Sequence, residues 1–176
     1  MFVWFAAGAV AIVWTVFRSP AVDFRVVAAG SVVALLEVPF GVGPMESVVA
    51  PVMCLVLVMA LTTGRRLVRR RWLGLPIGMF LHLVLDGAFT DAHAFWWPLA
   101  GTSTFTRRAF VLDRGVWSVV LELAGLAIAA WLWGEFGLSD HERRTRFVRT
   151  GQVDRSRVRR TREQGPRPRA GGGATP

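Results

Sequence analysis

The chain has 176 residues, of which 53% are hydrophobic, and eight of them are tryptophans. This composition argues against a soluble core and indicates a membrane protein. The formal net charge is +9, but residues 1–138 hold ten arginines against eight acids, whereas residues 139–176 hold eleven against four. The single cysteine excludes a disulfide framework or a thiolate zinc site within one chain.

Three apolar runs precede a dense cluster of arginines. The run from Phe2 to Phe17 predicts a first membrane helix; a cleaved signal peptide is the alternative, but the basic segment that should precede its apolar run is missing. The run from Val22 to Val38 is closed by a segment rich in proline and glycine, which cannot continue a helix. The run from Val48 to Leu61 has Pro51 near its start, where proline is tolerated.

The segment from Arg65 to Arg71 carries five arginines, and we predict that it is a cytoplasmic loop because positive charge collects on that side of a membrane. Further spans are predicted from Trp72 to about Gly87 and from Val116 to Phe136. Gly101 to Arg114 then forms an outer loop, whose three arginines run against the charge bias. The sequence thus predicts an all-α, polytopic bundle of about five membrane helices in the inner membrane, with four or six spans as alternatives. Its N-terminus lies outside and its C-terminus in the cytoplasm.

The chain divides by composition into a transmembrane helical domain, residues 1–138, and an arginine-rich cytoplasmic tail, residues 139–176. The tail contains few large apolar side chains and is predicted to be disordered from about Gly165. Its charge favours binding to anionic lipid, nucleic acid or a cytoplasmic protein.

The scarce ionisable groups of the apolar runs gather around His82 and Asp86, which stand one helical turn apart on the same face. Because such groups are costly in hydrocarbon, we expect them to be enclosed by protein or a watery cavity rather than to face lipid. Helical rise places Asp86 about 21 Å from the inner face and Glu122 about 9 Å below the outer face, hence at a similar level. Glu37 reaches about 18 Å, and Glu46 stands at the outer entrance to its span.

Imidazole and carboxylate groups suit a divalent metal ion, zinc or manganese above all, and also suit acid-base chemistry. The alternative for His82 and Asp86 is a helix-to-helix hydrogen bond without chemistry. Glu37 and Glu122 have the alternative of pairing with His82 or with an arginine of the outer loop. Asp91 and His93 fall in a loop, where a solvated surface role is the default.

Gly78, the segment from His82 to Asp86, and the later pair Trp97-Pro98 resemble the membrane-bound metal-dependent hydrolases, also described as LexA-binding, inner-membrane-associated hydrolases. The resemblance covers about residues 30–140 and is strongest to small actinobacterial members. It implies that His82 and Asp86 match the helical His and Asp of the family. Where that family has a His followed by Ser or Thr, this chain has Glu46-Ser47; a carboxylate can replace imidazole as a ligand, or the site has lost its activity.

The leading hypothesis is a metal-dependent hydrolase acting on a membrane-associated ester or phosphoester. His82 and Asp86 would be ligands, Glu46 or Glu37 would complete the coordination sphere, and Glu122 would be the general base for a metal-bound water. A second hypothesis is a non-enzymatic membrane anchor whose basic tail binds its partner. A third is a small transporter or proton relay, although no inverted repeat is evident.

Overall fold

The computed structural model describes residues 1–19, 22–36, 44–90, 95–99 and 115–153, and these residues form helices and turns with no strand among them. The α-helices are α1 (Phe2–Phe17), α2 (Phe24–Val33), α3 (Val49–Leu61), α4 (Arg66–Trp72), α5 (Gly74–Asp86), α7 (Val116–Phe136) and α8 (His141–Thr150). Short 3-10 turns are η1 (Ala34–Leu36), η3 (Pro44–Glu46) and η4 (Ala88–Thr90). The all-α prediction is confirmed for this part of the chain.

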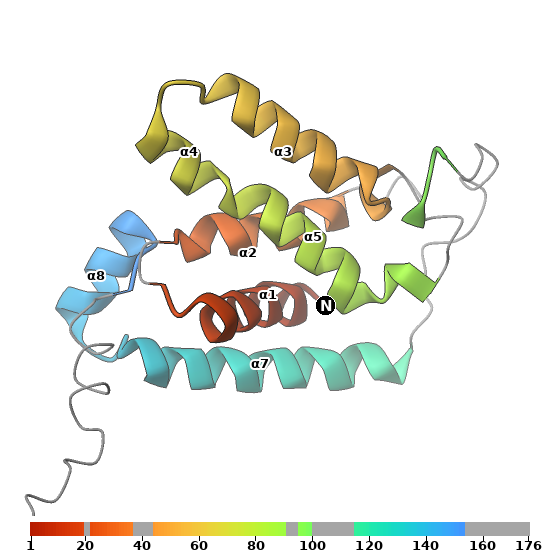
Figure 1. The fold of residues 1–176 in the computed structure, drawn as a ribbon. Coiled ribbons are helices and arrows are strands. Elements are labelled where there is room, and N and C mark those ends of the chain that lie inside the picture. The colour runs from red at the N-terminus through yellow and green to blue at the C-terminus, as the bar shows by residue number, and fades with distance from the viewer. Residues whose placement is uncertain (20–21, 37–43, 91–94, 100–114, 154–176) are drawn as a thin grey trace, which may run out of the picture.

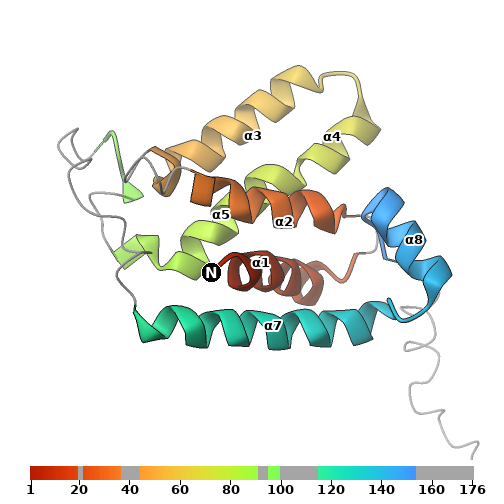
Figure 2. The ribbon, with the colours of Figure 1, turned by 180° about the vertical axis from the view of Figure 1, so that it is seen from behind.

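The long helices run back and forth between two ends of a bundle (Figure 1). Both views show α1 between α2 and α7, with α3 farthest from α7 (Figures 1 and 2). α5 packs on α2 and α1, and α3 packs on α5. The C-terminal ends of α1, α3 and α7 and the start of α2 therefore lie at the end where α4 and α8 are found.

The first and last long helices have the bounds that the sequence predicts, whereas the arginine segment differs. The prediction of a loop from Arg65 to Arg71 was wrong, because Arg66–Trp72 is the helix α4. Arginine is a good helix former, and the Leu73 amide donates to the carbonyl of Arg69 (3.0 Å), so α4 continues almost directly into α5. α2 is shorter than predicted and passes at Ala34 into a 3-10 turn. Glu37 lies outside the described residues.

α2 and α5 approach each other closely because glycine stands at their contact points. A Cβ atom on Gly78 would lie 2.1 Å from the carbonyl oxygen of Val27, and one on Gly30 would lie 2.3 Å from that of Leu75. Neither backbone atom can move aside cheaply. Small residues allow the same close approach between helices in membranes, where dispersion and interhelical contacts replace the hydrophobic effect.

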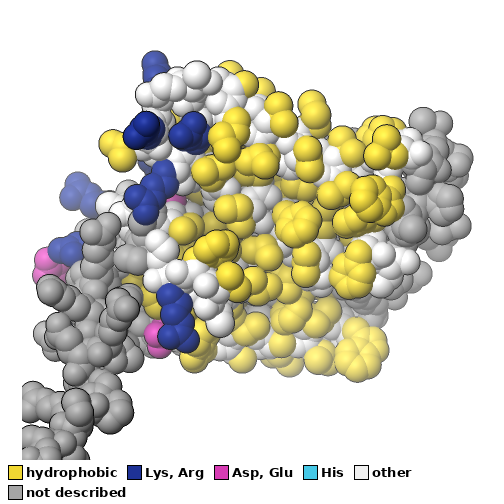
Figure 3. Space-filling model, viewed as in Figure 1, with side chains coloured by type: hydrophobic (Ala, Val, Ile, Leu, Met, Phe, Trp, Pro, Cys, Tyr) yellow, Lys and Arg dark blue, Asp and Glu magenta, His cyan; other side chains and the backbone are white. Residues whose placement is uncertain are grey.

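Much of the face of the bundle that Figure 3 shows is apolar. On α3, Pro51 and Val58 are buried, whereas most of the other large side chains are exposed: Val52, Met53, Leu55, Val56, Leu57, Met59 and Leu61. Among the described helices, α7 alone has the length and apolar composition expected of a membrane span, and only 11% of its apolar window is buried. A contiguous apolar surface of this kind marks contact with lipid or with another protein.

Candidate functional site

The buried face of α5 carries the ionisable pair that the sequence singled out. Gly74, Gly78, His82 and Asp86 follow one another at intervals of four residues, and all four are buried. His82 is 2% exposed and Asp86 is 6% exposed. The expectation that protein encloses both side chains is confirmed.

Residues of α1 and α2 close this face over His82. The ring of Phe5 lies against the imidazole with the ring centroids 4.2 Å apart, and the backbone of Ser31 interacts with the same imidazole. Ser31 is fully buried and donates its hydroxyl to the carbonyl of Ala28 (2.8 Å). The close approach at Gly78 brings Ser31 into this position, since a Cβ there would lie 2.8 Å from the Ser31 amide nitrogen.

The imidazole retains an unused hydrogen-bonding atom. Nδ1 of His82 is buried and has no hydrogen-bond partner among the residues that the structure describes. Such an atom is expensive to enclose unless something contacts it. It is therefore available, on chemical grounds, to a metal ion, a proton or a ligand.

Glu122 lies at the start of α1 rather than in a cluster with His82. Its Oε1 accepts from the amide of Val3 (3.2 Å), and its Oε2 lies 3.4 Å from the amino nitrogen of Met1. The first amides of a helix lack partners within the helix and favour negative charge. Close packing of α1 on α7 brings the groups together, because a Cβ on Gly125 would lie 2.5 Å from the amide nitrogen of Trp4.

Of the other candidate residues named from the sequence, the structure describes Glu46. Glu46 ends η3, directly before Ser47, which is 1% exposed. The neighbouring Val48 amide donates to the carbonyl of Phe95 (3.0 Å), and this bond ties the start of α3 to the segment that follows η4. Glu37, Asp91 and His93 fall outside the described residues.

The donors in the described part of the chain do not complete a metal site. No group of three or more His, Cys, Asp or Glu side chains that could hold an ion occurs within residues 1–19, 22–36, 44–90, 95–99 and 115–153. His82 and Asp86 would supply two ligands, while structural zinc takes four protein ligands and catalytic zinc usually three. The described donor set therefore does not fit the metal on its own.

Asp23 is a structural residue that the sequence analysis overlooked. It is 2% exposed, caps α2 by accepting from the Arg25 amide (3.1 Å), and forms an ion pair with Arg71 of α4 (2.9 Å). It also packs against the backbone of Gly151, where no side chain would fit. An Asp directly before an apolar helical run is a recognised cap signal and could have revealed this role.

Contacts at the Asp23 end attach α8 to the bundle. The Phe24 amide donates to the carbonyl of Gly151 (3.0 Å), and the Arg25 guanidinium donates to that of Val148 (2.5 Å). Phe147 of α8 packs on Phe136, which in turn packs on Trp14 and Phe24. The first part of the arginine-rich tail thus belongs to the folded bundle.

Each arginine within the described ranges belongs to this same end of the bundle. They are Arg18 after α1, Arg25 in the first turn of α2, Arg65 and those of α4, and the four of α8. The exposed arginines project at this end in Figure 3, beside an apolar face. We call it the basic end.

Comparison of the chain with protein-family models, curated proteins and solved structures finds no match. The likeness to membrane-bound hydrolases therefore remains an expectation from the sequence.

Proposed function

We propose that this chain is a five-span protein of the inner membrane whose basic end lies in the cytoplasm and binds anionic lipid headgroups, acting as a membrane anchor. One observation carries the proposal: the arginines of the described residues gather at one end of the bundle, beside an apolar face (Figure 3). Positive charge on the cytoplasmic side sets the orientation of membrane helices.

Helix lengths support α7 most directly as a span, and the other four helices of the proposed bundle are shorter. α7 has 21 residues, or about 32 Å, and α1 has 16, or about 24 Å. α2, with 10 residues, α3 and α5 are shorter, but η1 follows α2, η3 precedes α3, and α4 extends α5 at the basic end. A short span is accommodated by local thinning of the bilayer and by flanking side chains that reach the interface.

Charge at the basic end supplies affinity for an anionic surface. Each arginine near such a surface contributes about 1 kcal/mol at ordinary salt, and the contribution falls off within a Debye length. Nucleic acid or an acidic cytoplasmic protein would be attracted by the same charge. Anionic lipid is favoured because exposed arginines project directly beside the apolar face that would meet the bilayer (Figure 3).

Membrane extraction and lipid binding test this proposal together. The full chain should stay in membranes washed with alkaline carbonate and should require detergent for release. The chain, held in nanodiscs, should bind vesicles rich in phosphatidylglycerol more strongly than vesicles of phosphatidylcholine. This difference in binding should shrink as the salt concentration rises. Release by carbonate would contradict the five spans, and a preference that salt leaves unchanged would contradict the electrostatic role.

A metal-dependent hydrolase is the second candidate, favoured by the enclosed pair His82 and Asp86. If both are ligands, His82→Ala or Asp86→Asn should lower bound zinc by at least the 10- to 100-fold typical of losses around a metal site, with the protein still inserted. Glu46→His restores the residue type of the resembling family and should tighten zinc binding. A parent and Glu46→His protein that both lack metal after zinc loading would eliminate this candidate.

A further inference from the structure

An apolar groove runs along α1 between α2 and α7, with a volume of about 420 Å³. Small side chains, Ala6, Ala28 and Ala129, contribute to it from the three helices, and larger ones such as Phe2 and Trp133 border it. From Phe2 to Val10 it follows α1 for about 12 Å. Its volume falls within the range of about 300–1,000 Å³ that is common for small-molecule sites.

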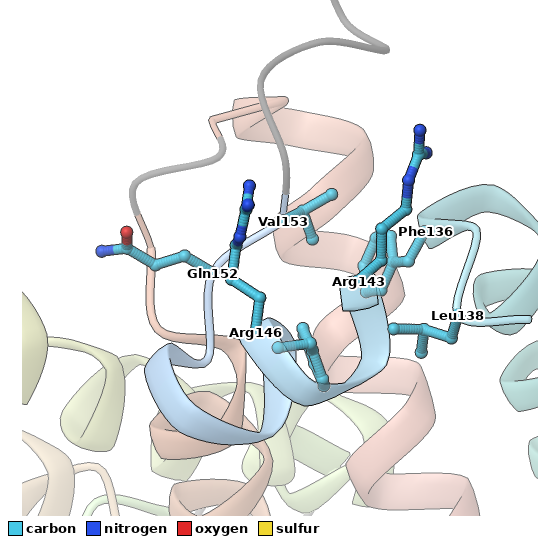
Figure 4. Close-up of a pocket in the computed structure, with 7 residues that line it drawn as sticks. Phe136, Leu138, Arg143, Arg146, Gln152 and Val153 are labelled. Carbon is cyan, nitrogen blue, oxygen red and sulfur yellow. The ribbon is translucent and has the colours of Figure 1, made fainter. Parts of the chain in front are cut away.

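The groove becomes cationic at the basic end. Among the described residues that line the groove, Arg25 is the charged one. Phe136, Leu138 and Phe147 are shared between the groove and a small cavity lined by Arg143 and Arg146. Figure 4 shows these two α8 arginines extending to the same side of the helix. One nitrogen of the Arg25 guanidinium donates to Val148, while the group has five N–H donors in all.

α8 arginines also form short-range ion pairs on their own helix. Arg143 lies 3.5 Å from Asp140, and Arg146 lies 3.5 Å from Glu142. The Asp140 and Glu142 side chains are 56% and 86% exposed, so solvent screens both pairs and each contributes little. An incoming phosphate can therefore compete for these guanidinium groups.

We propose that the groove is a specific site for one anionic phospholipid of the inner leaflet. An acyl chain lies along α1, and the phosphate contacts Arg25 and Arg143 where the groove meets α8. Charge complementarity favours this occupant, because an apolar groove with cations at one end matches a molecule with an apolar chain and an anionic head. The site rests on the proposed membrane insertion, since only then does the groove open to lipid.

The first test blocks the groove with a large side chain and measures lipid retention. The full chain is purified in mild detergent and offered phosphatidylglycerol and phosphatidylcholine with identical acyl chains, and native mass spectrometry counts the retained lipid. We expect one phosphatidylglycerol on the parent protein and at least a tenfold loss in Ala129→Phe. Ala130→Phe is the matched control, because Ala130 is the next residue of α7, is exposed, and does not line the groove.

A second groove-blocking variant shows whether lipid loss in Ala129→Phe results from misfolding. Ala28→Phe blocks the groove from α2 and should lose the lipid as Ala129→Phe does, while both variants keep the melting behaviour of the parent in detergent. Equal lipid retention in the parent, both groove variants and Ala130→Phe would overturn the site. Loss of a dimer, rather than of lipid, in the two groove variants would assign the groove to a second copy and overturn it as well.

Substitution of arginines separates lipid binding in the groove from general attraction of anionic lipid to the basic end. Arg25→Gln with Arg143→Gln should weaken phosphatidylglycerol retention by about fivefold for each arginine. Arg69→Gln with Arg70→Gln removes the same charge from α4, away from the groove, and should leave the bound lipid in place. Equal losses of lipid in both double variants would contradict the groove site but not the membrane insertion of the chain. Release of the parent chain by carbonate would contradict the proposed membrane insertion itself.

Discussion

Asp23 and Asp86 are both buried acids of this bundle, yet their surroundings assign them different roles. Asp23 caps α2, pairs with Arg71 and receives the end of α8, so its burial is accounted for by holding the basic end together. Asp86 instead shares a buried face with His82, one turn away, under a cover from α1 and α2. Burial alone thus does not distinguish a structural acid from a candidate functional acid, and the neighbours of each must be compared.

The largest expected effect tests the cover over His82. Gly78→Ala would place a Cβ 2.1 Å from a backbone carbonyl of α2, and overpacking of this kind costs about 1–3 kcal/mol, with the upper end expected because backbone must move. Gly134→Ala is the matched control, since nothing lies within 4 Å of its Cβ position. Thermal unfolding in detergent should show a clear loss for Gly78→Ala and none for Gly134→Ala. Equal stability of the two variants would mean that α2 and α5 do not meet as described.

A smaller effect is expected at Asp23. Asp23→Ala should lower the free energy of unfolding by about 1–2 kcal/mol, chiefly through loss of the α2 cap. The ion pair adds little, because the Arg71 side chain is 55% exposed. The variant should also expose α8 to trypsin. Asp23→Asn keeps a capping side chain and should lose less; a larger loss in Asp23→Asn than in Asp23→Ala would remove the cap from the explanation.

The smallest effect is expected at Glu122, the acid that serves the start of α1. Glu122→Gln keeps a side-chain oxygen that can accept from the Val3 amide, so the change removes chiefly the ion pair with the amino group of Met1. Glu122→Gln should therefore cost about 0.5 kcal/mol in the same unfolding measurement. If it instead abolished folding, or abolished zinc binding in a protein shown to hold zinc, the separation of Glu122 from His82 and Asp86 would be contradicted.

Local pattern predicts the elements of this fold better than their contacts. The bounds of α1 and α7 follow from apolar runs that end at Arg18 and Gly137. The loop predicted at the arginine segment is wrong because arginine is a good helix former, and adjacent positive charges do not prevent a helix there. In the candidate site, the shared face of His82 and Asp86 follows from helical periodicity.

The cover over that face could not be predicted in the same way. Phe5 and Ser31 reach His82 only through the pairing of helices distant in the sequence. The four-residue spacing of Gly74 and Gly78 was the available signal, because small residues at this interval favour close contact between membrane helices. Glu122, in contrast, was placed beside Asp86 by depth alone, and depth does not say which way a side chain faces.

The orientation of the chain in the membrane is the central claim, and a topology reporter tests it most directly. A fluorescent protein or an alkaline phosphatase, active respectively inside and outside the inner membrane, is fused after Arg71, Arg160, Pro44 or Trp97. We predict a cytoplasmic reporter after Arg71 and Arg160 and an external reporter after Pro44 and Trp97, because the basic end of the bundle should stay on the cytoplasmic side. An external reporter after Arg71 would contradict the account.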